Sequence, residues 1–270
     1  MHENKWIEKD GIVYPGIVRG PSSTDTIVIL FSGLGFPMSD RDYFMSRIAT
    51  EIQEFATVYQ FDLRGHGDHS IDLEQTTLNG MKADICNILQ EVIKECEHPV
   101  SCIARGISPL LCMQVSKELG ENTICGIIGF NPYMIDNKKL KTLFYEIYSQ
   151  DDLIAVEKYS MNPDFKSVLR AMGADIEYIK GESIPVEFFR ELDQLEAIKI
   201  FNQFTGKKVF LYPKYDKNYT LEILQGNDIT DYRELDKRED AMLPYNSFWQ
   251  SESINVIKQI LLNWSEDNDK

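Results

Sequence analysis

The feature that most constrains this chain is a regular alternation of short apolar runs with longer amphipathic stretches. The apolar runs lie at 26–31, 57–62, 99–104 and 124–131, and the stretches between them lie at 40–55, 77–96 and 109–119. The runs have the length of strands, and the stretches place apolar residues at helical spacing. Continuous apolar strands separated by helices indicate an α/β fold, with a mostly parallel sheet covered by helices on both faces. An antiparallel pair at 6–7 and 12–18, turning at Asp10-Gly11, is expected to precede this sheet.

The alternation stops after the run at 124–131. Residues 133–205 read as several helices with loops, and the strand pattern resumes at 207–213, more weakly at 229–235, before a final helix at 251–264. A helical block between the sixth and seventh strands predicts a cap over the carboxyl edge of the sheet, where open α/β sheets bind ligands. We therefore expect a single domain over residues 1–270 that carries a helical cap insertion at 133–205.

Composition excludes several classes of partner and cofactor. The net charge of −15 opposes binding to nucleic acid or to an anionic membrane surface. The longest apolar run is too short to span a membrane, and the first residues lack the pattern of a secretory signal. The five cysteines show no metal-ligand spacing, which favours reduced thiols in a cytoplasmic protein. No dinucleotide fingerprint, P-loop or HExxH motif is present, so we expect no cofactor and no metal.

Four motifs carry a resemblance to a known family. They are FSGLGFP at 31–37, FDLRGHGDHS at 61–70, the strand-to-helix turn in VSCIARGISPLLCMQV at 100–115, and LYPKYD at 211–216. Together they resemble the α/β-hydrolase fold family, in the places of its oxyanion loop, its D-x-R-G-H-G-x-S segment, its nucleophile elbow and its acid. The resemblance covers about residues 5–264 and implies the fold, whereas function has to be argued from the site.

The elbow decides whether this chain has a nucleophile. The family pattern is small-x-nucleophile-x-small, and the hydrophobic register places Ala104, Gly106 and Ser108 at those positions. Glycine accepts the strained turn but has no group that can attack a substrate. A rival register makes Ser108 the nucleophile and puts Leu110 where the tight crossing needs a small residue. Because Ser108 stands directly before Pro109, we interpret it as the N-cap of the following helix.

The histidines argue against a conventional triad. The resemblance implies a general base in the loop at 236–248, and this loop contains no histidine. Without that base a serine is not deprotonated at neutral pH. Asp216 stands in the place of the family's acid, and we interpret it as vestigial. If Ser108 were a nucleophile, His69 is the histidine that could approach it.

Backbone donors at the elbow predict a polar anchor. The amides of Leu34 and Ile107 are expected to converge, and donors at a helix N-terminus favour a carbonyl oxygen, a carboxylate or a phosphate. Arg105 could add positive charge to this site or form an ion pair with a nearby carboxylate. The candidate ligand-binding residues are Ser32, Gly33, Leu34, Arg105, Gly106 and Ile107.

Three hypotheses remain open at this point. The first is a protein without the Ser-His-Asp triad that binds a small or peptide ligand under its cap, or that runs a non-hydrolytic reaction such as isomerisation or epimerisation. The second is an active serine esterase, thioesterase or peptidase that uses Ser108 with Asp216 and an atypical base such as His69. The third is a structural or interaction scaffold with an empty pocket. The sequence leaves the oligomeric state open.

Overall fold

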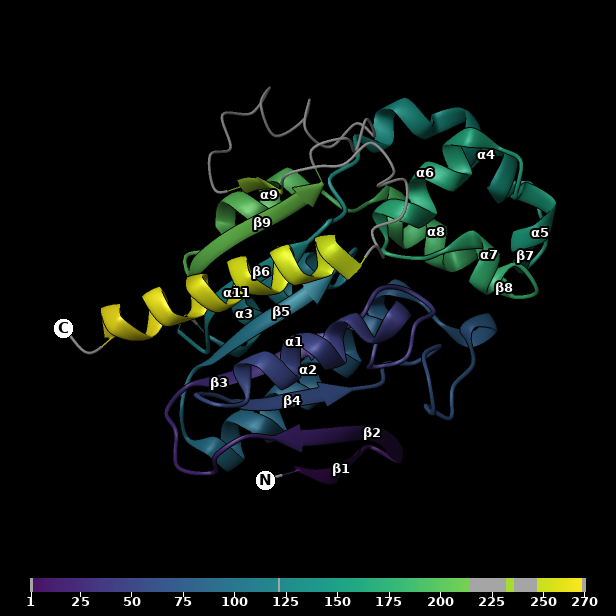
Figure 1. Ribbon diagram of the computed structural model, residues 1–270. Helices are drawn as coiled ribbons and strands as arrows, with labels where there is room; N and C mark the ends of the chain where they lie inside the picture. The colour runs from purple at the N-terminus through teal and green to yellow at the C-terminus, as the bar shows by residue number, and fades with distance from the viewer. Residues whose placement is uncertain (1, 121, 214–231, 236–246, 269–270) are drawn as a thin grey trace.

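A single large sheet organises the molecule, which a computed structural model describes for residues 2–120, 122–213, 232–235 and 247–268. Within these residues the sheet has eight strands in the order β1-β2-β4-β3-β5-β6-β9-β10 (Figure 1). Their bounds are β1 His2–Lys9, β2 Ile12–Arg19, β3 Ile27–Phe31, β4 Thr57–Phe61, β5 Val100–Arg105, β6 Ile124–Phe130, β9 Lys207–Pro213 and β10 Tyr232–Leu235. The β1–β2 and β2–β4 pairs are antiparallel and the remaining pairs are parallel, which confirms the predicted mostly parallel sheet.

Helices cover both faces of the sheet. The helices are α1 Phe44–Ile52 and α11 Ser247–Asn268 on one face, and α2 Leu78–Cys96 and α3 Ser108–Leu119 on the other (Figure 1). Because side chains alternate along a strand, Val28 and Leu30 pack with α1 and α11, while Ile29 packs with α2 and α3. No helix in the described ranges is long and apolar enough to cross a membrane.

The first helix is shorter than the predicted stretch at 40–55. A 3-10 turn, Arg41–Tyr43, precedes it, and Asp40, Asp42 and Tyr43 all have left-handed backbone angles, with φ between 52° and 59°. An α-helix cannot run through residues in this conformation, so α1 begins only at Phe44. The final helix, in contrast, is longer than the predicted 251–264.

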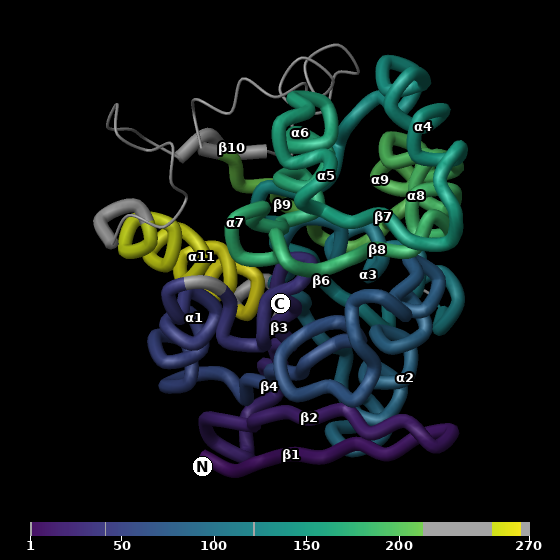
Figure 2. Tube along the Cα trace, turned by 90° about the vertical axis from the view of Figure 1, so that its right-hand side faces the viewer, coloured from purple at the N-terminus to yellow at the C-terminus, as the bar shows by residue number. Residues whose placement is uncertain are grey.

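Residues 133–205, called the helical segment below, connect β6 to β9. They contain the 3-10 turn Asn137–Leu140, then α4 Lys141–Tyr148, α5 Val156–Tyr159, α6 Pro163–Ala171, α7 Ile176–Ile179, α8 Val186–Asp193 and α9 Ala197–Gln203. A small antiparallel pair, β7 Leu153–Ala155 and β8 Ser183–Pro185, joins two of the loops and was missing from the sequence prediction. Figures 1 and 2 place most of this segment beyond the carboxyl ends of the parallel strands, at the opposite end of the molecule from β1.

The five cysteines are all free thiols. Cys102 and Cys112 are buried in the interface between β5 and α3, and the other three are partly buried. Burial raises the pKa of the Cys125 thiol, which keeps it protonated and unreactive at neutral pH.

Candidate functional site

The turn between β5 and α3 is held by main-chain hydrogen bonds on both sides. Gly106 stands at its tip with φ +65°, a left-handed conformation that glycine adopts with little strain. Its amide donates to the carbonyl of Phe130 at the end of β6 (N–O 3.0 Å), and its carbonyl accepts from the amide of Tyr133 (2.8 Å). The tip is therefore tied to the neighbouring strand and to the start of the helical segment.

The space into which a side chain at position 106 would point is filled. A Cβ atom built on Gly106 would lie 2.1 Å from the carbonyl oxygen of Met172 and 2.5 Å from the amide nitrogen of Gly173. Both distances are far below van der Waals contact. The main chain of the helical segment thus occupies the place where a nucleophile's side chain would stand.

The loop after β3 meets the same two residues. The amide of Leu34 donates a hydrogen bond to the carbonyl oxygen of Met172 (3.2 Å). Gly173, with φ +85°, would place a Cβ 2.8 Å from the Cα of Gly33 and 3.2 Å from the Cα of Gly106. Gly33, Gly106 and Gly173 therefore pack backbone against backbone, and we call this arrangement the glycine contact.

The cover extends along the rest of this loop. The rings of Phe36 and Tyr178 stack with centroids 4.7 Å apart. A Cβ on Gly35 would lie 2.7 Å from the Cγ2 atom of Ile179. Within the loop, the Ser32 hydroxyl donates to the carbonyl of Phe36 (2.9 Å). Residues 172–179 of the helical segment thus close over the loop from Gly33 to Phe36.

Ser108 does not cap the helix, so that interpretation was wrong. Helix α3 begins at Ser108 itself, and the residue before it, Ile107, has helical angles (φ −79°, ψ −27°) and makes no side-chain cap. The Ser108 hydroxyl is fully buried and donates instead to the carbonyl of Ser32 (3.2 Å), which ties the elbow to the loop after β3. Pro109 does lie in the first turn, as expected.

Arg105 is paired inside the protein. Its guanidinium, 3% exposed, donates from Nη1 to Oδ1 of the buried Asp40 (2.6 Å) and lies 5.5 Å from the centre of the Phe36 ring. Of the two roles considered for Arg105, the structure contains the ion pair. The pair holds the side chain of Asp40, which is the first of the left-handed residues just before α1.

Comparison with known proteins decides the fold. The sequence matches no protein-family model, and it is not significantly similar to any curated protein. Among solved structures it is similar to Est1E from Butyrivibrio proteoclasticus, with ferulic acid bound (TM-score 0.70, 12% identity, 97% of this chain and 99% of that chain). It is also similar to DcsB in complex with its substrate analogue (0.72, 11%, 97% and 99%). A third similar structure is the α/β hydrolase GrgF from Penicillium sp. sh18 (0.68, 14%, 97% and 98%). This chain has the α/β-hydrolase fold.

The structural similarity establishes the fold, whereas any activity has to be inferred from the residues of this chain. Identities of 11–14% are too low to carry over an activity. The resemblance in sequence predicts an elbow formed by β5, Gly106 and α3, and it predicts that the loop from Ser32 to Phe36 stands in the place of the oxyanion loop; we call this stretch the oxyanion loop. Asp216 and the histidine-free stretch 236–246 lie outside the described residues.

His69 is not arranged as a general base. Its Nδ1 accepts a hydrogen bond from the amide of Ile71 (3.0 Å), so the neutral ring carries its proton on Nε2. The ring packs against Tyr14, with centroids 5.6 Å apart, and burial lowers the pKa of His69. The contacts of the described residues do not bring it to Ser108.

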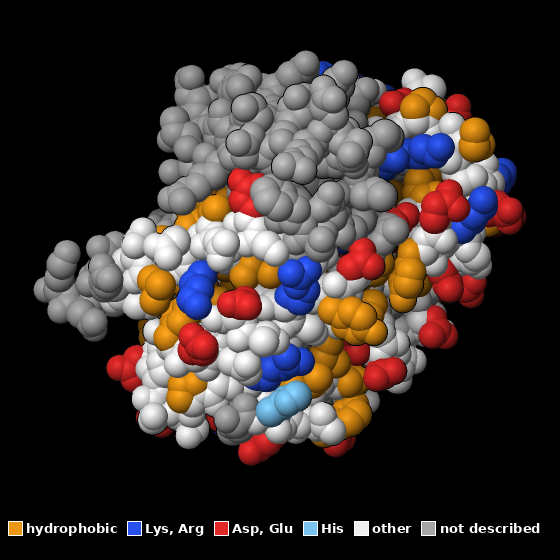
Figure 3. All heavy atoms as spheres, viewed as in Figure 1, with side chains coloured by type: hydrophobic (Ala, Val, Ile, Leu, Met, Phe, Trp, Pro, Cys, Tyr) orange, Lys and Arg blue, Asp and Glu red, His pale blue; other side chains and the backbone are white. Residues whose placement is uncertain are grey.

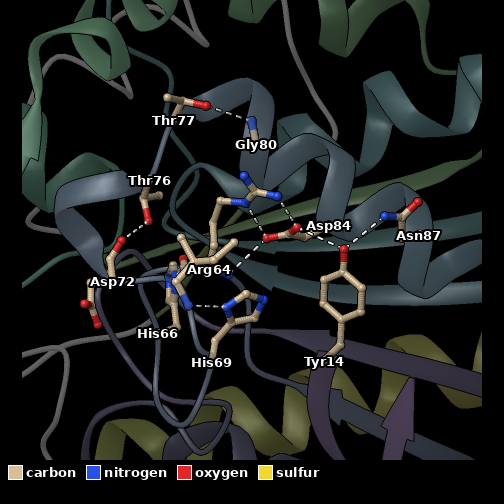
Figure 4. Close-up of polar contacts among 11 residues, drawn as sticks. Tyr14, Arg64, His66, His69, Asp72, Thr76, Thr77, Gly80, Asp84 and Asn87 are labelled. Carbon is tan, nitrogen blue, oxygen red and sulfur yellow. Dashed lines mark hydrogen bonds and ion pairs between the residues drawn. The ribbon is translucent and has the colours of Figure 1, made fainter. Parts of the chain in front are cut away.

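The D-x-R-G-H-G motif builds a buried polar cluster that sequence reasoning missed. Arg64 donates to Asp84 of α2 through Nε (2.8 Å) and Nη2 (2.6 Å), and Tyr14 donates to the same carboxylate (3.2 Å) (Figure 4). Asn87 completes the cluster by donating to the Tyr14 hydroxyl (2.9 Å). Burial raises the pKa of Tyr14 to about 12, so the hydroxyl stays protonated. The cluster anchors the turn at Arg64 to α2 and to β2.

Asp62, at the start of the same motif, binds the chain just after the oxyanion loop. Its two carboxylate oxygens accept from the amides of Met38 (2.5 Å) and Asp68 (2.9 Å). Burial raises its pKa, which these two amides oppose. The histidine of the motif, His66, is buried with Nδ1 at 2.5 Å from the carbonyl of Arg64, and burial lowers its pKa. The motif therefore acts as a scaffold for the loops beside the elbow.

A groove of about 670 Å³ lies away from the elbow, between α2, α3, α8 and α9. Its lining includes the buried side chains of Leu111 and Met113, and none of the residues that line it belongs to the oxyanion loop or to the turn at Gly106. This groove is therefore separate from the site where the fold would carry out hydrolysis.

Proposed function

We propose that this chain is a non-hydrolytic protein of the α/β-hydrolase fold, which acts by binding rather than by catalysis. One observation carries the proposal: the main chain of Met172 and Gly173 occupies the place of a nucleophile's side chain above Gly106. Ester or amide hydrolysis in this fold needs a nucleophile at that place, an adjacent base and free donors for the oxyanion.

Two of these requirements, the nucleophile and the free oxyanion donor, lack support in the described residues. Glycine at position 106 offers no attacking group, and the hydroxyl of Ser108 is fully buried and already donates to a carbonyl. The Leu34 amide, one of the two expected oxyanion donors, donates to the Met172 carbonyl. Binding is favoured over isomerisation or epimerisation because the charged group beside the turn, Arg105, is held in an ion pair with Asp40.

A second candidate function is the binding of a small or peptide ligand under the helical segment, which would then act as a cap. The hydrogen bond from Leu34 to Met172 supports it, because a carbonyl or carboxylate of a ligand could replace the Met172 oxygen. This replacement requires the segment around Gly173 to move away from Gly33 and Gly106. Ligand binding at this place is therefore coupled to the opening of the glycine contact.

The proposal is tested by incubating the purified chain with a fluorophosphonate probe and measuring its intact mass. A known serine esterase serves as the positive control, and Ser108→Ala is the matched variant of this chain. We expect no covalent adduct on the wild type, while the esterase is fully labelled. An adduct on the wild type that disappears in Ser108→Ala would overturn the proposal in favour of an active serine hydrolase.

The second candidate has its own test. N-acetylglycine, which offers both an amide carbonyl and a carboxylate, is titrated into ¹⁵N-labelled protein. A saturable shift of the Leu34 and Gly173 amide signals supports ligand binding under the cap. Unchanged signals for both residues at high ligand concentration count against it for ligands of this class.

A further inference from the structure

The strand β1 forms an open edge of the sheet. It is the first strand in the sheet order, it pairs with β2 on one side, and no described strand pairs with its other side. Figures 1 and 2 both show it at the lower border of the molecule. A free strand edge presents a row of backbone donors and acceptors to which another strand can add.

This edge lacks most of the usual protection against pairing. The eight residues HENKWIEK contain no proline, and the β1–β2 ladder runs from His2 to Lys9 without a bulge. Lysines often protect an edge by their charge. Here Lys5 contacts Glu95 and Lys9 contacts Glu91, both on α2, so both side chains turn toward α2 while part of each stays accessible to a partner strand. Trp6 points to the opposite face and is 62% exposed.

The charge of β1 differs from that of the whole molecule. The chain carries a net charge of −15, although Figure 3 shows carboxylates interspersed with lysine and arginine side chains on the face that carries α1 and α11. Two copies of such a protein repel each other over most of their surface. β1 carries two lysines and two glutamates and is neutral with its histidine uncharged. It is therefore a place where two copies can approach with little repulsion.

We propose that β1 pairs with β1 of a second copy of this chain in an antiparallel, two-fold symmetric dimer. In antiparallel pairs, opposite residues direct their backbone groups both toward the partner strand or both away from it. When a strand pairs with its own copy, the two residues of each opposite pair must therefore both be odd-numbered or both be even-numbered. The two-fold axis then passes through one residue, on which the pairing is centred, and not between two residues. Within His2–Lys9, the centres that keep seven residues paired are Lys5 and Trp6.

Charge selects between these two registers. Centred on Lys5, the strand places Lys5 opposite the same lysine of the second copy, which is unfavourable. Centred on Trp6, it places Glu3 of each copy opposite Lys9 of the other, and the two exposed tryptophans face each other. Opposite charges and aromatic pairs across strands both stabilise a sheet. The register centred on Trp6 is the one that the dimer adopts.

The test uses charge reversal with rescue, read out by sedimentation equilibrium over a wide range of protein concentration. We expect the wild type to dimerise and Glu3→Lys to raise the dimer dissociation constant about tenfold or more, because it creates two like-charge pairs. Adding Lys9→Glu in the same chain restores opposite charges and is expected to return the constant to within about threefold of the wild type. Glu51→Lys, an exposed site on α1 with the same charge change, is the matched control.

Three outcomes would overturn the proposal. A wild type that stays monomeric at all concentrations would show that β1 does not pair with its own copy, and that any partner of the edge is a different protein. An equal effect of Glu3→Lys and Glu51→Lys would show that net charge alone governs association. Failure of the double variant to recover, with an unchanged melting temperature, would rule out the register centred on Trp6.

Discussion

The carbonyl oxygen of Met172 accepts a hydrogen bond from the amide of Leu34, with 3.2 Å between the two atoms. In an acyl-transfer enzyme of this fold, the corresponding amide stabilises the oxyanion of the substrate. Here the amide donates to the protein's own main chain, and Gly173 packs against Gly33 and Gly106 beside it. The helical segment thus closes the elbow with backbone atoms.

Substitution of Gly106 by alanine is expected to lower the free energy of unfolding by about 3 kcal/mol or more, because strain and overlap with Met172 add together. Two other glycines separate these causes. Gly11 also has a positive φ but no atom near its Cβ position, so Gly11→Ala should cost about 1 kcal/mol from strain alone. Gly181 has neither a positive φ nor a close neighbour, so Gly181→Ala should stay within about 0.5 kcal/mol of the wild type. Urea unfolding measures all three. Equal costs for Gly106→Ala and Gly11→Ala would show that residues 172–173 do not press on the elbow.

Substitution of Ser108 by alanine is expected to cost about 1 to 2 kcal/mol, because the buried carbonyl of Ser32 loses its hydrogen bond donor. Chemical denaturation gives this value, with Ser167→Ala as a comparison, since Ser167 is only half-buried and its hydroxyl bonds within its own helix. If Ser108 were held in reserve as a nucleophile, its removal would leave stability unchanged or raise it.

Substitution of Arg105 by methionine is expected to cost about 3 kcal/mol, because the buried carboxylate of Asp40 then lacks its cationic partner. Adding Asp40→Asn should recover part of this loss, since asparagine carries no charge and tolerates the left-handed φ of 58°. A double-mutant cycle by thermal and urea unfolding measures the coupling. Additive effects of the two substitutions would contradict the ion pair.

Acidification is expected to destabilise the protein below about pH 6.5. Burial lowers the pKa of both His66 and His69, so the unfolded chain binds protons at a pH where the folded chain does not. The free energy of unfolding therefore falls as pH decreases, by about 1.4 kcal/mol per pH unit for each histidine that is protonated only in the unfolded chain, until the folded ones titrate as well. Asp62, whose pKa burial raises, acts in the opposite direction at lower pH.

The variant His69→Gln isolates one of these two histidines. It removes one titrating group and leaves His66 and Asp62 in place, so the pH dependence of the unfolding free energy between pH 7.5 and 5.5 should become about half as steep. Urea unfolding at several pH values measures this slope. An unchanged slope would show that His69 titrates normally in the folded chain.

Most of the fold could be predicted from the sequence because strand and helix patterns are local. The alternation of apolar runs with amphipathic stretches placed β3 to β6 and the helices between them within a few residues. The start of α1 was misplaced because Asp40, Asp42 and Tyr43 adopt left-handed conformations that no local pattern predicts, and Asp40 is paired with Arg105, 65 positions later in the chain. The β7–β8 pair was missed because strands of three residues are too short for a periodic pattern.

The candidate site was less predictable because its decisive contacts join distant segments. Sequence reasoning placed glycine at the tip of the elbow, yet it could not show that Met172 and Gly173 fill the space above that glycine. The hydroxyl of Ser108 had a plausible local role as a helix cap, and a carbonyl 76 residues earlier, that of Ser32, binds it instead. The alternatives left open for Arg105 were resolved in the same way, by the distant carboxylate of Asp40.

The proposed function depends most directly on the closure of the elbow by Met172 and Gly173 in solution. Amide hydrogen exchange of Leu34, followed by NMR, measures this closure at the donor itself. We expect the Leu34 amide to exchange at least about a thousandfold more slowly than an unprotected amide, and Gly106→Ala to accelerate this exchange. Exchange of Leu34 in the wild type within about tenfold of the unprotected rate would contradict the closed elbow.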